Sequence, residues 1–445
     1  MQEKKIGFLE AFSIGVGGMV GGGIFAVLGL TIDLAKGAAP ISFAIAGFIA
    51  LVTVYSYVKL SLRYPSEGGT IEFIVQAFGN GMFSAFINTL MLVSYVIMIA
   101  LYAYAFGSYG SALFLGKDVA WLHNTLSVGV IVLFTLVNLM GAYLTGKTED
   151  IMVLLKVAIL LLFAVVGFFT IDFSRLSPEH YESLPSIVTG GLIIFLAYEG
   201  FELIANTARD VENPEKNLPL AYYSAVVFVI ALYVLIAVVT IGNVSFEEVK
   251  KAQDYVLAIA AKPFFGEAGF VLIGIAALLS TASAINATIY GSGRVAVLVA
   301  KLGELPRTFE KRIKAGFEGM IVLALLSIIF TLSFDLENIS IAGSIGFLII
   351  FALVNLANFK LYKETGGCRI ISGFGFLLAL AAVGVLVWYN SAHSPQALKT
   401  SFIAILTVAL FVVVYYYIKK DNRLAQYIDK NLEADEEKKE KKKGI

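Results

Sequence analysis

Residues 15–23 hold six glycines within an uncharged apolar run, Ala11 to Ile32, that is long enough to cross a bilayer. A glycine costs about 1 kcal/mol relative to alanine in a helix interior, so an ordinary helix is disfavoured here. In lipid, backbone that leaves the helix must find polar partners or line a cavity. We therefore predict a spanning helix interrupted around a cavity. The bare N–H groups of one half and the bare C=O groups of the other can bind a ligand that carries both charges.

The same glycines also fit a continuous helix that packs closely against a neighbour. Gly17 and Gly21 are four residues apart, as are Gly18 and Gly22, and this spacing of small residues is common at helix contacts in membranes. On this stretch alone, both interpretations stay open.

The composition predicts a polytopic membrane protein. Of the 445 residues, 58% are hydrophobic and only 15% are charged, which is too much apolar surface for a soluble core of this size. The net charge of zero gives no indication of a nucleic-acid partner. A single cysteine, Cys368, excludes an intramolecular disulfide and any multi-cysteine metal site. His123, His180 and His393 fall near loops and are interpreted as surface residues, so no metal and no cofactor is expected.

Apolar stretches of about 20 residues predict twelve transmembrane spans in an all-α membrane protein. The spans cover approximately residues 10–33, 40–62, 80–115, 123–146, 149–171, 186–208, 218–243, 267–299, 316–334, 338–360, 370–391 and 399–418. Residues 66–79 are interpreted as an amphipathic lead-in to the long third span, and residues 245–262 as a surface helix. The charged tail from Lys419 onward is expected to be largely disordered.

An even number of spans places both termini on one side of the membrane. The loops and ends on that side carry 25 Lys and Arg residues, against 7 on the opposite side. By the positive-inside rule, the sequence predicts a multi-pass cell-membrane protein with both termini in the cytoplasm.

The sixth span repeats features of the first. Gly200 precedes Pro219 by 19 residues, just as Gly21 precedes Pro40 by 19 residues, and each proline opens the following span. The two glycine sites are five spans apart. Because five is an odd number, the first and sixth spans cross the membrane in opposite directions. Paired interruptions in corresponding positions indicate an inverted-repeat transporter. The predicted units are 1–172 and 173–360, with five spans each, then 361–420 with two spans and the tail 421–445.

The sixth span also carries two carboxylates, Glu199 and Glu202, three residues apart on one helix face. An ionisable group at membrane depth costs several kcal/mol and should face a cavity or a partner. Glu202 is near the end of the span, where it is either solvated or bonded to unwound backbone or a neighbouring helix, and we favour that structural role. Glu199 lies beside Gly200 at the expected break, where a substrate or proton role is open.

Lys156 is the strongest single candidate for a functional residue. It lies eight residues from the start of the fifth span near Thr148, about 12 Å deep, and its side chain reaches roughly 6 Å, so snorkelling to water is incomplete. Burial disfavours the charged form of a lysine, which suits a group that loads and releases a proton. A buried ammonium group can also occupy the position of a bound Na⁺ ion. The alternatives are a lysine that partly snorkels to water or a lysine permanently paired with Glu202. We favour a functional role, because ionisable residues within the membrane are usually functional.

Hydroxyl groups in the eighth span offer one further candidate. Most such groups bond their own helix backbone, whereas Ser280 could coordinate a cation or bond Lys156. Tyr102, Tyr104 and Tyr109 are interpreted as packing residues or as an interfacial belt.

Three motifs resemble those of the amino acid–polyamine–organocation (APC) transporter superfamily. Residues 21–25 resemble its G-S/A-G-I-F, residues 195–202 its F-x-A-F/Y-x-G-x-E, and residues 210–219 its E-x-x-N-P-x-K/R-x-I/V-P. The resemblance extends over about residues 1–420. Residues 286–291 and 303–306, together with Lys156, are similar to archaeal proton-coupled amino acid transporters of this superfamily.

This resemblance implies the LeuT-type fold, an inverted repeat of five plus five helices with broken helices 1 and 6 and two further C-terminal helices. It also implies that the Lys156 ammonium fills the place of the sodium ion in sodium-coupled relatives, contacting the Gly17 carbonyl and Ser280. Two segments are implied to bind substrate, comprising Met19, Gly21, Gly22, Gly23, Phe195, Ala197, Tyr198 and Glu199.

In the implied arrangement, the substrate carboxylate meets N–H groups around Gly22 and Gly23. The ammonium meets carbonyls near Phe195 and Ala197, and Tyr198 resembles an aromatic gate. The chain departs from the family pattern twice. Gly22 replaces a frequent Ser or Ala, and Glu199 stands where a neutral residue is common, which leaves the substrate class open.

The predicted function is secondary active import of amino acids, coupled to protons, by alternating access. One alternative is an amine or basic amino acid transporter or exchanger, which Glu199 motivates, and another is a sensor or channel with a transporter fold. Coupling to sodium is disfavoured because Lys156 would repel the ion. An enzyme is not expected, because the sequence shows no nucleophile–base pair. The expected partners are an amino acid, a proton and the bilayer, and the oligomeric state is open.

Overall fold

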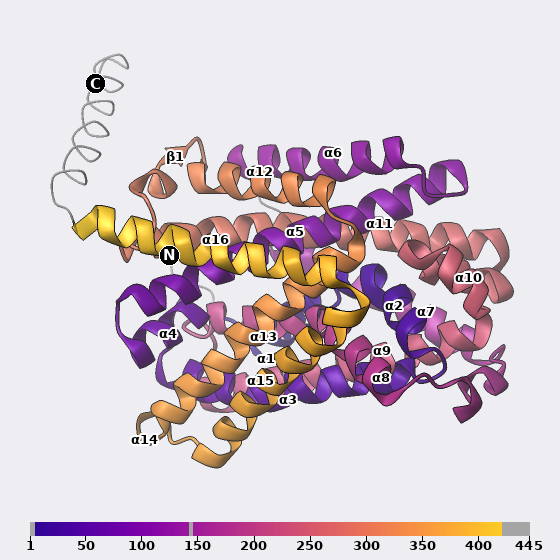
Figure 1. Cartoon of the computed structure of the whole chain (residues 1–445), viewed down its shortest axis with the longest axis horizontal. Helices are drawn as coiled ribbons and strands as arrows, with labels where there is room; N and C mark the ends of the chain where they lie inside the picture. Colours follow the sequence, from indigo (N-terminus) through magenta and orange to yellow (C-terminus); the bar gives the residue numbers. More distant parts are fainter. Residues whose placement is uncertain (1–4, 142–145, 421–445) are drawn as a thin grey trace.

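The structure, a computed structural model, describes residues 5–141 and 146–420, and helices make up most of it (Figure 1). The first half contains α1 (Phe8–Met19), α2 (Gly23–Ala35), α3 (Ala39–Arg63), α4 (Thr70–Phe78), α5 (Met82–Leu115), α6 (Ala120–Leu139), α7 (Gly146–Phe168) and α8 (Leu184–Ile194). The second half contains α9 (Pro214–Asn243), α10 (Phe246–Lys251), α11 (Val256–Lys301), α12 (Glu318–Ser333), α13 (Leu336–Lys360), α14 (Tyr362–Thr365), α15 (Arg369–His393) and α16 (Pro395–Lys420).

Short 3₁₀ segments and one hairpin complete the described chain. The 3₁₀ segments are η1 (Phe173–Leu176), η2 (Pro178–His180), η3 (Phe195–Thr207), η4 (Gln253–Tyr255) and η5 (Arg307–Glu310). Strands β1 (Arg312–Ile313) and β2 (Gly316–Phe317) pair antiparallel in a small hairpin that the sequence did not predict.

Each predicted span coincides with a helix or a pair of helices. Among the described residues, ten helices are long and apolar enough to cross a membrane, and the bent pair α1–α2 makes eleven. The remaining predicted span is α12, whose 16 residues are fewer than the roughly 20 needed for a straight crossing. The predicted tail, 421–445, lies outside the described residues.

The interruption of the first span is confirmed. α1 ends at Met19, α2 begins at Gly23, and the two helices are bent by 48°. Close packing of the same stretch is also found, because a Cβ on Gly18 would lie 2.7 Å from the Gly200 carbonyl oxygen. The helix is therefore interrupted rather than continuous, and its glycines also allow the close approach to a neighbour that the alternative expected.

The sixth span differs from the expected break at Glu199–Gly200. The α-helix ends earlier, at Ile194, and the chain does not unwind but continues as the 3₁₀ segment η3. A 3₁₀-helix is narrower than an α-helix. The close crossing accounts for the glycine, since a Cβ on Gly200 would lie 2.1 Å from the Gly18 carbonyl carbon.

Two other expectations concern short helices. The lead-in to the third span is present as α4, with an apolar face in the core. The predicted surface helix over 245–262 is instead split between α10, η4 and the first turns of α11, which kinks at Gly266 (φ 63°) before the long membrane segment.

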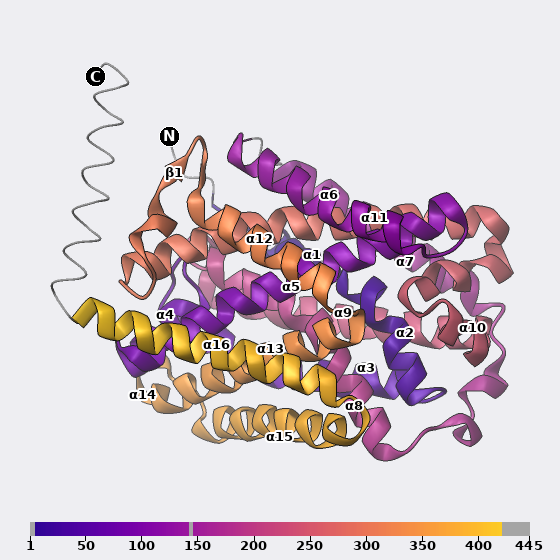
Figure 2. The ribbon, with the colours of Figure 1, turned by 45° about the horizontal axis from the view of Figure 1, so that its top comes forward.

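The broken helices lie at the centre of the bundle. η3 packs against α1 and α3, α2 packs against α8, and α5 lies beside α11. α6 and α12 lie side by side at one edge, and α15 and α16 pack on the outside of α13 (Figures 1 and 2). α5 and the α8–η3 segment are almost wholly buried, whereas α6, α15 and α16 turn much of their apolar surface outward, as lipid-facing helices do.

Candidate functional site

The carbonyl groups released where α1 ends are bonded by side chains from three other helices. Lys156 Nζ on α7 donates to the Gly17 carbonyl at 2.9 Å, and the Tyr233 hydroxyl on α9 donates to the Met19 carbonyl at 2.6 Å. The Ser280 hydroxyl on α11 donates to the Gly21 carbonyl at 2.7 Å. These three carbonyls are therefore satisfied within the protein, as membrane burial requires.

The donor side of the break begins at a residue that cannot cap the helix with a side chain. The N-cap of α2 is Gly22, which makes no side-chain capping bond, and the first N–H groups of a helix have no partner within that helix. Glycines let neighbours approach closely: a Cβ on Gly23 would lie 2.7 Å from the Ala197 Cβ, and one on Gly22 would lie 2.3 Å from Tyr102 Cδ1. The start of α2 thus presents positively polarised N–H groups of the kind that bind a carboxylate.

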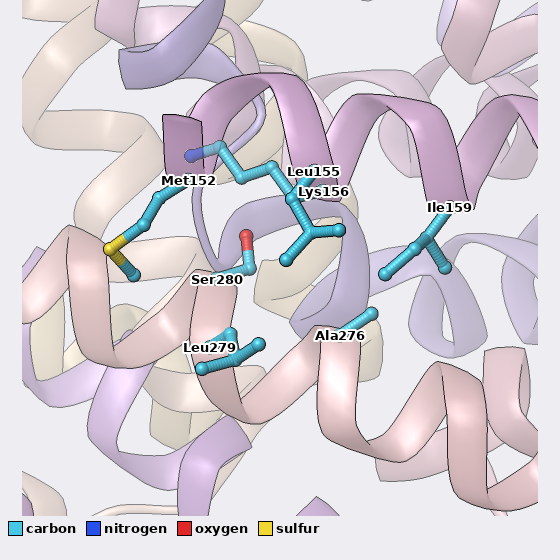
Figure 3. A pocket seen from close by; sticks show the side chains of 7 residues that line it. All are labelled: Met152, Leu155, Lys156, Ile159, Ala276, Leu279 and Ser280. Carbon is cyan, nitrogen blue, oxygen red and sulfur yellow. The ribbon is translucent and has the colours of Figure 1, made fainter. Parts of the chain in front are cut away.

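Lys156 is buried, with 4% of its surface exposed, although it lies in an apolar helix. With Ser280 and apolar side chains of α7 and α11, it lines a cavity of about 10 Å³, the lower limit for one water (Figure 3). Figure 3 shows its side chain extending along α7 above Ser280. The contact with the Gly17 carbonyl that the resemblance implies is present, and its part in proton coupling stays a prediction.

A cavity of about 70 Å³ lies beside the break, between α1, η3, α5 and α11. Gly17 and Gly18 line one side, Tyr95 and Tyr102 another, and Glu199 contributes a carboxyl group. Glu199 is 7% exposed, and its Oε2 atom is buried without a hydrogen-bond partner among the described residues. Burial of a carboxyl oxygen in this way favours either a protonated carboxyl group or a bound cationic partner.

Glu202, one helical turn further, lies in a different environment. Its Oε1 accepts a hydrogen bond from Tyr95 at 2.6 Å, and its Oε2 accepts bonds from Thr70 at 3.1 Å and Tyr57 at 3.4 Å. The carboxyl group thus joins η3 to α3, α4 and α5. It bonds neighbouring helices, as the structural interpretation expected, rather than bulk water.

Of the predicted substrate residues, only Glu199 is among those that line the 70 Å³ cavity. Met19, Phe195, Ala197 and Tyr198 come together around the break but are buried in packing contacts. The Tyr198 hydroxyl donates to the Phe43 carbonyl at 3.1 Å, so the side chain is anchored to α3. The substrate roles of these residues stay predictions.

Tyr233 is a site residue that sequence reasoning missed. Its hydroxyl lies 2.6 Å from the Met19 carbonyl oxygen and 3.4 Å from the Ala197 carbonyl oxygen, so one side chain joins both interrupted helices. Its ring packs on Tyr198 with centroids 5.2 Å apart. In the sequence, Tyr233 is one tyrosine within an apolar run, and no spacing marks it.

The interpretation of His123 as a surface residue is wrong. His123 is 5% exposed, and its Nδ1 atom lies 3.0 Å from Asp118 Oδ2, where α5 and α6 meet. Burial acts to raise the pKa of Asp118, but hydrogen bonds from His123 and Ser108 and the charge of His123 outweigh it, so the pKa is lowered. His180 and His393 are exposed, and no group of three His, Cys, Asp or Glu side chains within residues 5–141 and 146–420 could hold a metal ion.

Comparison with known proteins decides the family. The amino acid permease family model matches residues 6–417, nearly the whole chain. The chain belongs to the amino acid permease family. This permease is therefore a membrane amino acid transporter of the APC superfamily and not an enzyme, and its family implies the LeuT fold.

Relatives of this permease cover almost its full length. It is 35% identical to the uncharacterized protein MJ0609 of Methanocaldococcus jannaschii, over 94% of this chain and 97% of the relative. It is 32% identical to the inner membrane transport protein YbaT of Escherichia coli, over 89% and 92%. The branched-chain amino acid permease BcaP of Bacillus subtilis is 22% identical, over 95% of each chain.

Proposed function

We propose that this permease is a secondary active transporter that imports amino acids together with protons by alternating access. The observation that carries the proposal is the asymmetry of the α1–α2 break. The released carbonyls are bonded by Lys156, Tyr233 and Ser280, whereas the N-cap residue Gly22 gives the start of α2 no side-chain cap. A carboxylate is the partner that this end of the break lacks.

The substrate ammonium would bind on the opposite side of the break. There α8 ends at Ile194 and the chain continues as η3, so we place the ammonium at carbonyls near Phe195 and Ala197, the second of which the Tyr233 hydroxyl approaches only to 3.4 Å. An amino acid zwitterion then spans the gap between the two interrupted helices, and its binding shifts the balance between outward-open and inward-open states.

Proton coupling is assigned to Lys156. Its protonated amine makes a charge-assisted hydrogen bond to the Gly17 carbonyl, which holds α7 against α1. Loss of the proton removes the charge and loosens this contact on the side of the termini, so that α1 can move. The likeness of this region to the archaeal proton-coupled amino acid transporter ApcT supports the assignment, as does the expected repulsion of Na⁺ by the ammonium.

The decisive experiment is uptake of radiolabelled amino acids into proteoliposomes containing the purified chain. With an acidic exterior, we expect accumulation above the external concentration, and a protonophore should abolish it. A permease driven by sodium would instead need a sodium gradient. Failure to accumulate any amino acid under either gradient would contradict active transport and favour a sensor or channel.

A second candidate, transport or exchange of amines and basic amino acids, is favoured by Glu199. Its Oε2 atom, which has no hydrogen-bond partner among the described residues, belongs to a side chain that lines the cavity beside the break, where a cationic group of the substrate would pair with it. Competition against labelled substrate separates the two functions. Preferential competition by arginine or putrescine over alanine, lost in Glu199→Gln, supports the second candidate, and preferential competition by alanine supports the first.

A further inference from the structure

A cavity distinct from the central one lies where the loop after α11 meets α5 and α16. Its volume is about 350 Å³, and none of its lining residues lines the cavity beside the break. The floor is formed by buried side chains, including Ala85, Glu304 and Val412, and the rim by the exposed residues Asn80, Tyr416 and Lys419. A cavity of this size can enclose a small polar group.

The loop that forms one wall is fixed by side chains from both neighbouring helical segments. The Leu302 carbonyl accepts a hydrogen bond from Asn80 Nδ2 at 3.2 Å, and the Leu305 carbonyl accepts one from the Tyr415 hydroxyl at 2.8 Å. Between them, the Gly303 carbonyl accepts a bond from Lys419 Nζ at 2.9 Å. The wall is therefore held in place before any ligand arrives, which reduces the entropy cost of binding.

Glu304 is the ionisable group at the floor of this cavity. It is 4% exposed, and its Oε2 accepts a hydrogen bond from Asn88 Nδ2 at 2.7 Å, while its Oε1 is buried with no hydrogen-bond partner among the described residues. Burial raises the pKa of Glu304, against the lowering effects of the Asn88 bond and the Lys419 charge. A bound hydrogen-bond donor with a positive charge would satisfy this oxygen.

Exposed aromatic side chains lie within two residues, along the sequence, of residues that line the cavity. Phe83 is 49% exposed, Phe411 is 38% exposed and Tyr417 is 63% exposed. Lys419 supplies a positive charge near the end of an apolar helix. Tyrosines and basic residues in such positions mark the interface between hydrocarbon and headgroups.

We propose that this cavity binds a zwitterionic group that carries a primary ammonium and a phosphate. The ammonium donates to Glu304 Oε1, and the phosphate accepts from Lys419, whose three N–H donors allow it to keep its bond to Gly303. A phosphatidylethanolamine headgroup and free phosphoethanolamine share this chemistry. The lipid is the source that the exposed aromatic surroundings favour.

Native mass spectrometry of the delipidated full-length chain tests the proposal with three lipids of identical acyl chains. These are phosphatidylethanolamine, phosphatidylcholine, whose ammonium has no N–H donor, and phosphatidylglycerol, which has no ammonium. We expect the wild type to retain phosphatidylethanolamine about tenfold better than either competitor, which is the scale of one charge-assisted hydrogen bond. Equal retention of all three lipids would overturn the proposal.

Substitutions separate the two halves of the site. Glu304→Gln should abolish the preference for the primary ammonium, whereas Lys419→Gln, at an exposed position, should weaken retention of all three phospholipids alike. Glu72→Gln, at a half-buried position on α4, is the matched control and should behave as the wild type. A preference that survives in Glu304→Gln would contradict the proposal. Displacement of the lipid by millimolar phosphoethanolamine would identify a soluble source for the same group.

Discussion

At the scale of single residues, the break between α1 and α2 is held by hydrogen bonds that each come from one side chain. Lys156, Tyr233 and Ser280 belong to three different helices, yet each bonds a carbonyl within residues 17–21. Such a bond contributes about 0.5–1.5 kcal/mol, or more when charged. The three together therefore fix the geometry of the break more than they stabilise the whole bundle.

The Asp118–His123 pair gives a pH-dependent prediction. A carboxyl group whose pKa is lowered by folding stabilises the protein above its ordinary pKa of 3.8, and the contribution is lost as the pH falls through the lowered value. Asp118→Asn should therefore lower thermal stability in detergent by on the order of 1 kcal/mol near neutral pH. The difference from the wild type should shrink below pH 3.8. A difference that is unchanged at lower pH would contradict this account.

Some of these residues could be predicted from the sequence and others could not. Lys156 stands out because a charge in an apolar span is expensive, and the glycine-rich stretch stands out because glycine weakens a helix. Tyr233 and His123 do not stand out, since their importance comes from which helices pack around them. Burial of His123 depends on the contact between α5 and α6, which no local pattern encodes.

At the scale of elements, the two interrupted helices solve the same problem differently. α1 and α2 separate over residues 20–22 with a 48° bend, whereas the sixth span stays helical and tightens into η3. The motifs and their spacing therefore predicted which stretch of each span departs from an α-helix more reliably than they predicted the backbone conformation in that stretch. The form follows from the crossing of Gly18 and Gly200, a contact between segments 182 residues apart.

The helix crossing predicts a strong effect of Gly200→Ala. The new Cβ would lie 2.1 Å from the Gly18 carbonyl carbon, which belongs to backbone and cannot rotate away. We expect a loss of stability of about 1–3 kcal/mol or more and a loss of uptake, measured by thermal unfolding and by proteoliposome transport. Gly384→Ala on α15 is the control, because its Cβ meets nothing within 4 Å. Wild-type uptake by Gly200→Ala would show that the crossing is not required.

At the scale of the whole molecule, the distribution of charge predicts that the chain ends and the α14–α15 connection lie in the cytoplasm. Cys368 tests this directly, because it is exposed in that connection and is the only cysteine of the chain. A membrane-impermeant maleimide should label it in inside-out vesicles and not in intact cells. Labelling in intact cells would reverse the predicted orientation.

The opposite side of the membrane can be checked in the same way. Glu179→Cys, in a Cys368→Ser background, places one cysteine at an exposed position of η2, between α7 and α8. This variant should be labelled in intact cells. The same pattern for both cysteines would contradict the predicted topology, because an odd number of spans should separate them.

The central claim is that a proton on Lys156 couples the pH gradient to movement of the broken helix. The most direct test compares uptake driven by a pH gradient with substrate exchange at equal pH, for the wild type, Lys156→Ala and the exposed control Lys363→Ala. We predict that Lys156→Ala keeps exchange but no longer accumulates substrate in response to the pH gradient, while Lys363→Ala matches the wild type. Accumulation by Lys156→Ala that still follows the pH gradient as in the wild type would contradict the account.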